Sequence, residues 1–471
     1  MPSTRIRVYS QLLGVLVIAA VSALNAAVPI YGQAGMEFTC GKTGGETSRT
    51  RLTAGSRYVV PGARVSASPA PIPAFGFDLV ASPTNFSAGA CSSDKPFFFS
   101  VGVPDGNYQV SLTLGSGAVS VTTVRAESRR LFVDRQRTPA GGSQDVFLNV
   151  SVRTELIAMP SGVSPGSVAP SGAAGDAEAG PARVKLKPRE IGALDWDEKL
   201  TLEFNGDHPG FRSISVKPIG NVPTVYLAGD STMVDQDKEP WAAWGQMLPV
   251  FFGPGVTIAN EAESGETIRR FTGERRFDKI LSTMRAGDYL MIQFAHNDQK
   301  QGTPVVTDLK GYLLRYVEAT RNKGASPILV TSINRRVFDA NGKIVDTLGG
   351  YPQAMREFAK EQNVPLIDLN AMSKIMFESM GPVGTLKAFV HFPANTFPEQ
   401  TTELKDDTHF TAYGAYELAR AVVQDILAQK LPLAQYLRKN ISGFDLARPD
   451  DAATFTLPRS PLVSSERPYG R

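Results

Sequence analysis

From residue 222 onward, short apolar runs alternate with stretches whose apolar residues recur at helical spacing. The apolar runs predict five buried strands, at 224–228, 256–259, 289–294, 327–330 and 364–368. The helical stretches include 308–323, 351–362 and 412–430. Because strands that alternate with helices form a parallel sheet covered on both faces, residues 222–435 are predicted to be an α/β domain. Ligands of such sheets bind beyond the carboxyl ends of the strands.

The pattern before residue 222 is different. Short runs of alternating or continuous apolar residues stand at 97–101, 108–112, 119–121, 200–204 and 214–216. Turn residues bound these runs, as in Pro104-Asp105-Gly106-Asn107 and Gly115-Ser116-Gly117. Several short strands at this spacing predict a β-sandwich over residues 36–219.

Two stretches have no predicted helix or strand. The segment at about 160–181 is rich in Gly, Pro, Ala and Ser, and it predicts a flexible loop or linker within the sandwich. It contains Gly162-Val163-Ser164-Pro165-Gly166, which matches the G-x-S-x-G nucleophile pattern. That motif requires a strand before it and a helix after it, so we interpret the match as a coincidence. Residues 436–471 show no clear period and are predicted to be an irregular tail.

The first residues have the features of a secretory signal. Arg5 and Arg7 precede an apolar run at 12–23, and small residues follow it up to Ala34. The run is shorter than the roughly 20 apolar residues that a membrane span needs, although an uncleaved anchor is the alternative. We therefore expect residues 1–34 to be a signal peptide and the mature protein to be secreted or periplasmic, with no membrane attachment after cleavage.

Composition and charge narrow the choice of partners. The 471 residues hold 49 Lys and Arg against 46 Asp and Glu, a formal net charge of +3. The basic residues are spread along the chain without a basic run, so we expect no nucleic acid as a partner; an acidic polymer is compatible with this charge. No His, Cys or carboxylate spacing suggests a metal site, and we expect no cofactor. The only cysteines, Cys40 and Cys91, could form one disulfide in an exported protein.

The first strand of the α/β region leads directly into a serine. Gly229-Asp230-Ser231-Thr232 follows the run 224–228, so the Ser231 hydroxyl should lie at the carboxyl end of a strand, where a substrate can reach it. Gly229 would allow a sharp turn there. A serine needs a neighbouring base to act as a nucleophile. The alternative is a turn whose Asp and Ser merely cap a helix.

A candidate base and its partner lie just before the last predicted helix. Asp406 precedes His409 by three residues, close enough to accept the Nδ1 proton of the imidazole and leave Nε2 free for Ser231. The alternative is that the aspartates at this point only cap the helix that follows.

Two further strand ends supply hydrogen-bond donors. Asn297 follows the strand at 289–294, and its amide could donate to a developing oxyanion. Gly265 lies between the second strand and its helix, where a backbone N–H meets the positive end of a helix dipole. Together with the N–H of Ser231, these groups predict an oxyanion hole, since all of them fall on one rim of one sheet.

These motifs resemble the four sequence blocks of the SGNH (GDSL-like) hydrolases, in the same order: Gly229-Asp230-Ser231, Gly265, Asn297 and Asp406-x-x-His409. The resemblance covers 222–430 and implies a flavodoxin-like fold, a triad of Ser231, Asp406 and His409, and an oxyanion hole of Ser231, Gly265 and Asn297.

The similarity is narrower than the superfamily. The runs 226–233, 241–252, 293–298 and 409–411 resemble rhamnogalacturonan acetylesterases, which implies removal of O-acetyl groups from galacturonate residues of acetylated pectic polysaccharide. The third block of the family usually begins with Gly, whereas this chain has Ala295.

The part before the α/β domain has its own resemblance. Residues 98–114 and 202–210 look like the galactose-binding-like sandwich that precedes some bacterial esterases, which suggests a carbohydrate-facing accessory module. A purely structural role is the alternative.

Three more residues are candidates for binding substrate. His296 could line the pocket or hydrogen-bond locally, and Trp244 could stack on a sugar or pack in the core. Arg269 could meet a galacturonate carboxylate or lie on a solvated helix face. The main hypothesis is therefore a secreted carbohydrate esterase that removes O-acetyl groups from pectic rhamnogalacturonan. The alternatives are an acetylxylan or other small-acyl esterase, and a non-catalytic carbohydrate-binding protein.

Overall fold

The computed structural model of the chain describes residues 35–41, 50–59, 74–79, 81–158, 182–301 and 305–468. All of these residues belong to one compact unit, Gly35–Arg471. The predicted signal peptide at 1–34 and the predicted loop at about 160–181 lie outside the described residues.

The second half of the chain forms the predicted α/β structure. Its five strands pair in parallel in the order β16-β15-β14-β12-β13. Their bounds are β12 (Thr224–Gly229), β13 (Thr257–Asn260), β14 (Tyr289–Gln293), β15 (Ser326–Val330) and β16 (Leu366–Ile367). The five apolar runs of the sequence are thus confirmed as neighbouring strands of one parallel sheet.

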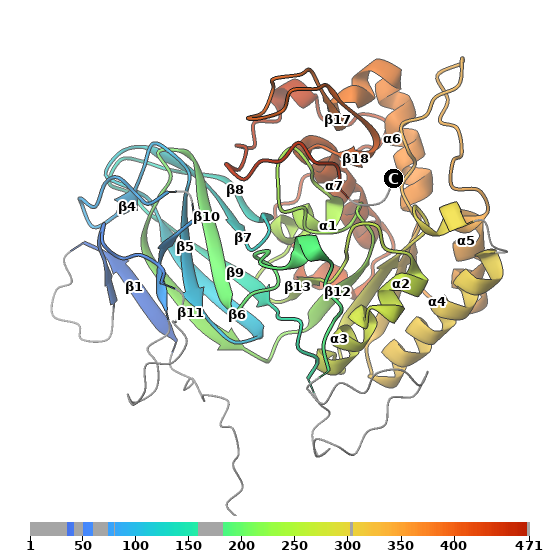
Figure 1. Cartoon of the computed structure of the whole chain (residues 1–471), viewed down its shortest axis with the longest axis horizontal. Helices are drawn as coiled ribbons and strands as arrows, with labels where there is room; N and C mark the ends of the chain where they lie inside the picture. Colours follow the sequence, from blue (N-terminus) through green and yellow to red (C-terminus); the bar gives the residue numbers. More distant parts are fainter. Residues whose placement is uncertain are drawn as a thin grey trace, which may run out of the picture. The chain divides into compact units, whose positions relative to one another are not determined.

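Helices cover both faces of this sheet (Figure 1). Side chains of successive strand residues point to opposite faces, so each buried strand offers apolar side chains to the helices on both sides. Val225 and Leu227 of β12 pack in one apolar cluster with the helices α1, α6 and α7, and Tyr226 and Ala228 pack in another with α2, α3, α4 and α5. The helix bounds are α1 (Trp244–Met247), α2 (Ile268–Gly273), α3 (Arg276–Thr283), α4 (Val305–Asn322), α5 (Tyr351–Glu361), α6 (Leu369–Gly384) and α7 (Ala412–Ala428).

The first half of the chain is β-rich in its described residues. One group of strands pairs in the order β9-β6-β11-β1-β2, with β4 also on β11, and a second sheet has the order β3-β5-β10-β7-β8. A separate apolar cluster that includes Phe97, Phe99 and Phe211 draws on both sheets. The bounds are β1 (Met36–Cys40), β2 (Thr50–Leu52), β3 (Phe75–Asp78), β4 (Cys91–Ser92), β5 (Phe97–Gly102), β6 (Gly106–Leu114), β7 (Ser120–Ala126), β8 (Arg130–Thr138), β9 (Gln144–Val152), β10 (Lys199–Asp207) and β11 (Gly210–Ile219).

The two halves share a sheet. Val150 of β9 pairs in parallel with Ile258 of β13, so that an 11-stranded sheet runs from β16 to β2. The predicted boundary near residue 220 is the point at which the chain leaves β11 and enters β12. Each half keeps its own apolar clusters, but backbone pairing makes the sheet continuous between them.

The sequence pattern does not predict the hairpin of β17 (Phe389–Phe392) and β18 (Leu404–Phe410), which forms a two-stranded sheet of its own. Short 3-10 helices complete the described structure: η1 (Pro188–Glu190), η2 (Leu248–Phe251), η3 (Asp298–Gln301), η4 (Thr385–Lys387), η5 (Pro432–Tyr436) and η6 (Ala452–Thr454). After η6 the chain up to residue 468 has no helix, yet it is tied to both halves, for example by a bridge between Val463 and Glu239.

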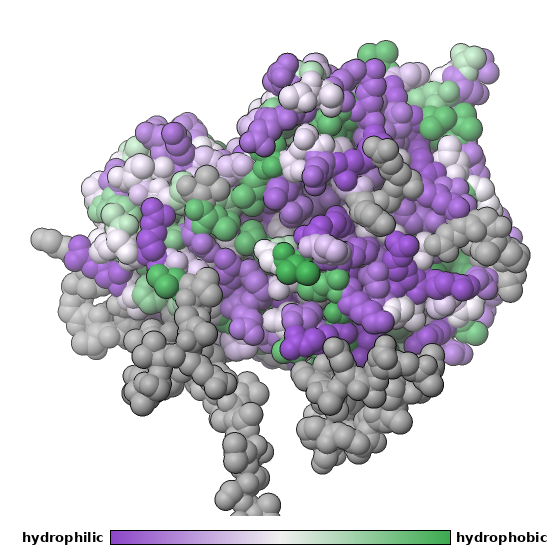
Figure 2. Space-filling model, in the orientation of Figure 1, coloured by the Kyte–Doolittle hydropathy of each residue, from purple (hydrophilic) through white to green (hydrophobic). Residues whose placement is uncertain are grey.

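On the face drawn in Figure 2, hydrophilic side chains cover most of the α/β part, and apolar side chains appear in small groups. The large apolar residues that are exposed are scattered from Val59 to Leu427. In the part of the chain that is described, no helix combines the length and the apolar character needed to cross a bilayer.

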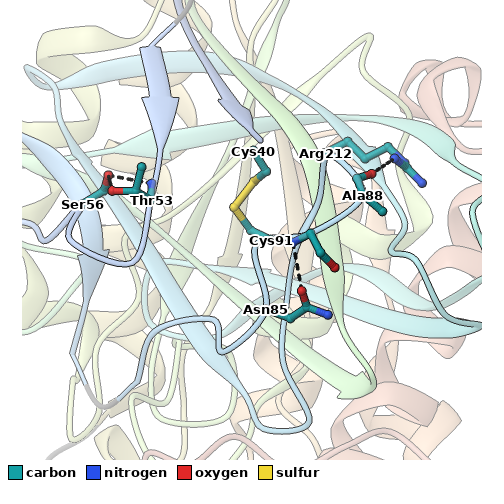
Figure 3. The surroundings of a disulfide bond; sticks show 8 residues. Cys40, Thr53, Ser56, Asn85, Ala88, Cys91 and Arg212 are labelled. Atoms are coloured by element: carbon teal, nitrogen blue, oxygen red, sulfur yellow. Dashed lines mark hydrogen bonds between the residues drawn. A yellow bond between two sulfur atoms is a disulfide. The ribbon is translucent and has the colours of Figure 1, made fainter. Parts of the chain in front are cut away.

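Cys40 at the end of β1 and Cys91 at the start of β4 form a disulfide (Figure 3), with their Cα atoms 5.5 Å apart. Both residues are buried, and both strands pair with β11. The bond therefore ties together two strands that are 51 residues apart in sequence.

Candidate active site

The turn after β12 places Ser231 at the carboxyl edge of the parallel sheet. Gly229 ends the strand, and a side chain there would come within 2.7 Å of the Met233 sulfur and 3.0 Å of the Gln293 carbonyl oxygen. Only glycine therefore allows β12 to approach β14 and the following turn this closely. The carbonyl of Ser231 accepts a hydrogen bond of 3.0 Å from Gln236 Nε2, which holds the turn in place.

Asp230 lies beneath this turn and is fully buried. Its Oδ1 accepts hydrogen bonds from the backbone N–H and the hydroxyl of Thr232, at 2.9 and 2.8 Å, and its Oδ2 lies 3.3 Å from His296 Nδ1. Burial opposes ionisation of this carboxyl, but His296 and the Thr232 donors outweigh burial and lower the pKa of Asp230 below its ordinary value. Asp230 thus acts as a buried anchor for the turn.

Three side chains form a continuous hydrogen-bonded chain at this edge. His409 Nε2 lies 2.9 Å from Ser231 Oγ, and His409 Nδ1 lies 2.9 Å from Asp406 Oδ2. With the ring proton on Nδ1 directed at Asp406, Nε2 can accept the proton of the serine hydroxyl. All three residues are at least 97% buried, with exposed fractions of 2% for Ser231, 2% for His409 and 3% for Asp406. The serine and the imidazole come from sites 178 residues apart in sequence.

The carboxylate of Asp406 is held by the hairpin on which it stands. Its Oδ1 accepts the backbone N–H groups of Thr408 and His409, at 2.8 and 3.0 Å. Burial disfavours the ionised form, but the hydrogen bond and the charge of His409, with these backbone donors, lower the pKa of Asp406 below its ordinary value. Asp406 and His409 lie on β18 itself rather than in a loop before the last helix.

The predicted oxyanion donors lie in the loops next to this chain. Gly265 has a φ of +78°, a backbone conformation that favours glycine. Within the described residues, neither the N–H of Ser231 nor that of Gly265 donates to another group. The side-chain amide of Asn297 donates to the Glu266 carbonyl at 3.0 Å, and its oxygen accepts from Lys300 Nζ at 3.3 Å, so both neighbours fix the amide orientation.

Residues that sequence patterns did not single out brace the Gly265 loop. Lys187, from the segment before η1, donates to the Ser264 carbonyl at 2.7 Å and also contacts the Glu266 carboxylate. The backbone N–H of Ile268 donates to Asp298 Oδ1 at 2.9 Å, which joins the loops after β13 and β14. No local pattern could have identified Lys187, because its partners are about 80 residues away in the chain.

The three candidate substrate-binding residues have different positions. Trp244 has no exposed surface, and its indole N–H donates to Gln293 Oε1 at 2.9 Å; it packs in the core and does not reach a substrate. His296 is 2% exposed, and its Nε2 lies 2.9 Å from the Ile333 carbonyl oxygen. Arg269 is exposed and pairs with Asp308 of α4, so its predicted substrate contact stays a prediction.

Ala295 is buried at 1% exposure and packs in the apolar cluster beneath α2 to α5. The extra methyl group relative to the usual glycine therefore points into the core. Among the described residues, no group of three or more His, Cys, Asp or Glu side chains could hold a metal ion.

A parallel sheet that carries a hydrogen-bonded serine, imidazole and carboxylate at its carboxyl edge has the arrangement of a serine hydrolase. Comparison with known proteins agrees with this class. The GDSL-like lipase/acylhydrolase family matches residues 227–417, a range that contains all five residues of the predicted triad and oxyanion hole.

Individual relatives narrow the class. The chain is 43% identical over 216 residues to the rhamnogalacturonan acetylesterase RhgT of Bacillus subtilis, covering 45% of this chain and 93% of that protein. It is 33% identical over 221 residues to a probable rhamnogalacturonan acetylesterase, YesY, of the same organism, covering 46% and 97%. An uncharacterized esterase of that organism, YxiM, is 26% identical over 340 residues, covering 70% of this chain and 74% of that protein.

The chain therefore belongs to the GDSL-like lipase/acylhydrolase family, as a rhamnogalacturonan acetylesterase-like member of the SGNH hydrolases. It is an enzyme that hydrolyses carboxylic esters.

Proposed function

We propose that the protein is an exported carbohydrate esterase that removes O-acetyl groups from pectic rhamnogalacturonan through an acetyl-enzyme on Ser231. The observation that carries the proposal is the chain of hydrogen bonds from Ser231 through His409 to Asp406, each of 2.9 Å. A serine hydroxyl is a weak nucleophile unless a base takes its proton. These hydrogen bonds supply His409 as the base and Asp406 as the carboxylate that orients it.

In the first half of the reaction, Ser231 Oγ attacks the acetyl carbonyl carbon while its proton passes to His409 Nε2. The carbonyl oxygen becomes an oxyanion that the N–H groups of Ser231 and Gly265 and the Asn297 amide stabilise. The intermediate collapses, the bond to the sugar oxygen breaks, and His409 returns the proton to that oxygen. The products of this half are the deacetylated sugar and acetyl-Ser231.

In the second half, water takes the place of the serine hydroxyl. His409 accepts a proton from the water as its oxygen attacks acetyl-Ser231, and the same donors stabilise the second oxyanion. Collapse breaks the ester as His409 returns the proton to Ser231 Oγ, and acetic acid leaves and ionises to acetate in water. Asp406 keeps its ionised form throughout and stabilises the imidazolium that forms in each half.

The pectic substrate is supported by the printed names of two relatives, a rhamnogalacturonan acetylesterase at 43% identity and a probable one at 33%. Export is supported by the basic residues and apolar run of segment 1–34 and fits a substrate outside the cell. We further propose that the β-rich half is a galactose-binding-like domain, on the basis of its two sheets and of residues 98–114 and 202–210.

The test is acetate release by the purified protein from acetylated rhamnogalacturonan, acetylated xylan and p-nitrophenyl acetate. We expect the highest kcat/KM on rhamnogalacturonan and a fall of about 10⁶ in kcat for Ser231→Ala, with an unchanged circular dichroism spectrum. A preference for xylan would overturn the pectic substrate alone. Equal acetate release by Ser231→Ala would overturn the acetyl-enzyme mechanism.

A further inference from the structure

Residues 458–467, close to the last described residue of the chain, form a segment that we call the C-terminal strap. It begins against the β-rich half, where its backbone and the Ser460 side chain bond to buried polar side chains. The Arg459 carbonyl accepts a hydrogen bond of 2.7 Å from Asn205, and the Ser460 hydroxyl donates to Glu203 at 2.8 Å. Since Glu203 is 3% exposed, the strap closes over a buried charge at this end.

The strap then passes along the segment that follows the nucleophile. The backbone N–H of Glu239 donates to the Leu462 carbonyl at 2.8 Å, and the N–H of Ser464 donates to the Glu239 carbonyl at 2.9 Å. The indole N–H of Trp241 donates to the Ser464 carbonyl at 3.2 Å, and the Trp241 ring meets the His409 ring edge-on at 6.0 Å between centroids. These bonds bring the strap to the side of the catalytic imidazole.

The C-terminal strap places the guanidinium of Arg467 next to the triad carboxylate. Arg467 Nε lies 2.8 Å from Asp406 Oδ2, the same oxygen that accepts the Nδ1 proton of His409 at 2.9 Å. A second nitrogen of the same guanidinium donates to the carbonyl of Lys405, the residue before Asp406. Asp406 is 3% exposed and the Arg467 side chain 35%, so the guanidinium lies between the buried carboxylate and solvent.

We propose that Arg467 is a positioning residue of the active site, which fixes the orientation of Asp406 and weakens the support that this carboxylate gives to protonated His409. The inference rests on the proposed function, because it assumes that His409 is the base. A cation on Asp406 Oδ2 offsets part of the negative charge that stabilises an imidazolium on the same oxygen. Removal of the guanidinium should therefore strengthen the stabilisation that Asp406 gives to the imidazolium formed during catalysis.

Other charged groups lie near Asp406 and His409, and the variants used in the test must leave them unchanged. Lys300 interacts with Asp406 and Asp230, and burial, followed by the charge of Arg335, lowers the pKa of Lys300. On the outer side of the hairpin, Asp407 pairs with Arg336 and His391, at 2.8 and 2.9 Å. On the side of the nucleophile, the His409 ring contacts Ser231 and Trp241, neither of which carries a charge. Arg467 contacts the triad carboxylate directly, through Asp406 Oδ2.

The test compares R467Q, which removes the charge, with R467K, which keeps it. R448Q is the matched control, because Arg448 lies in the same C-terminal region, is 88% exposed and is 3.9 Å from its nearest carboxylate. The measurement is kcat/KM for p-nitrophenyl acetate from pH 4 to pH 9, whose acid limb reports the base of the free enzyme. For R467Q we expect the acid limb to move to higher pH by roughly half a unit. R467K and R448Q should keep the limb of the wild type.

An acid limb that stays in place in R467Q, whether or not the rate falls, would overturn the proposal, and so would an equal shift in R448Q. Loss of folding by both R467Q and a chain that ends at residue 466 would assign Arg467 to stability and would also overturn it. Failure of the proposed function is a separate result, since it appears as absent turnover by the wild type or full turnover by Ser231→Ala.

Discussion

The two halves of the proposed active site are held in different ways. Ser231 and the proposed oxyanion donors lie on turns of the large sheet, where neighbouring strands fix them; the N–H of Glu263, for example, donates to the Gly229 carbonyl at 3.1 Å. Asp406 and His409 lie on β18, which pairs with β17 in a separate two-stranded sheet. A two-stranded sheet alone is marginally stable in water, so this half depends on its attachments.

Those attachments come from several parts of the chain. The backbone N–H of Ala242 donates to the Phe410 carbonyl at 2.9 Å, α7 begins directly after the hairpin with Thr411 as its N-cap, and Arg467 of the C-terminal strap pairs with Asp406. The nucleophile half is thus built into the sheet, whereas the acid–base half is docked onto it. Changes in the two halves should therefore have different consequences, and the following predictions test that difference.

The largest effect is expected in the docked half. Asp406→Asn should lower kcat by about 10⁴ without unfolding the protein, because the amide cannot stabilise an imidazolium or enforce the Nδ1-protonated ring. The measurement is kcat for p-nitrophenyl acetate. Asp407→Asn is the control, since Asp407 is the adjacent carboxylate, is 47% exposed and faces Arg336. A loss of less than tenfold in Asp406→Asn would contradict the role of this carboxylate.

The next effect concerns the attachment of the nucleophile half to the β-rich half. Arg129, in the turn before β8, pairs with Glu239 at 2.6 Å with side-chain exposures of 2% and 4%, and it donates to the carbonyl of Trp241. Arg129→Met should destabilise the protein by about 3–5 kcal/mol, because it leaves a buried carboxylate without its cation. The check is the free energy of unfolding in urea, and Arg137→Met, on an exposed position of β8, should change it by less than about 0.5 kcal/mol. Equal effects of the two variants would show that Arg129 does not hold the segment of Glu239 and Trp241.

A smaller effect is expected from the oxyanion hole. Asn297→Ala should lower kcat by about 10²–10³ and leave KM nearly unchanged, since the amide acts on charge that exists only in the transition state. Steady-state kinetics on p-nitrophenyl acetate measure both constants, with the exposed Asn341→Ala as the control. A rise in KM with an unchanged kcat would mean that Asn297 binds the ground state instead.

The smallest effect is a change in pH dependence. Burial raises the pKa of Asp298 to about 7, against an ordinary value of 3.8, although the Ile268 N–H partly offsets this. The folded protein then holds a proton that the unfolded chain has released between these values, so this group makes stability fall as pH rises from about 4 to 7. Asp298→Asn removes that dependence. The Tm of this variant minus the Tm of the wild type should therefore rise by a few degrees as the pH is raised from 5 to 8. A Tm difference that is constant with pH would contradict the shift.

Local patterns were sufficient to predict much of the α/β half. Five apolar runs correspond to β12 to β16, because a buried parallel strand needs continuous apolar residues. Ser231, Gly265 and Asn297 follow from short motifs after predicted strands, and Asp406 and His409 follow from a motif before the last predicted helix. The structure brings these residues to one edge. Trp244 shows the limit of such reasoning, since a tryptophan near the nucleophile can equally pack in the core, as it does here.

Features that depend on distant pairing had no local signal. The parallel pairing of Val150 with Ile258, which joins the two halves, links segments 108 positions apart that have no shared period. Arg129 and Arg467 look like ordinary surface residues in the sequence, because only the fold supplies the buried carboxylates that they meet. The C-terminal strap likewise lacks a period because its backbone bonds to other segments rather than to itself.

The most direct test of the central claim, that the docked imidazole activates the serine of the sheet, is covalent labelling by a fluorophosphonate, followed by mass spectrometry of the peptides. We predict a single adduct on Ser231 in the wild type, formation of that adduct at least about 10³ times more slowly in His409→Ala, and no adduct in Ser231→Ala. An adduct on another residue, or labelling of Ser231 at an unchanged rate in His409→Ala, would contradict the account.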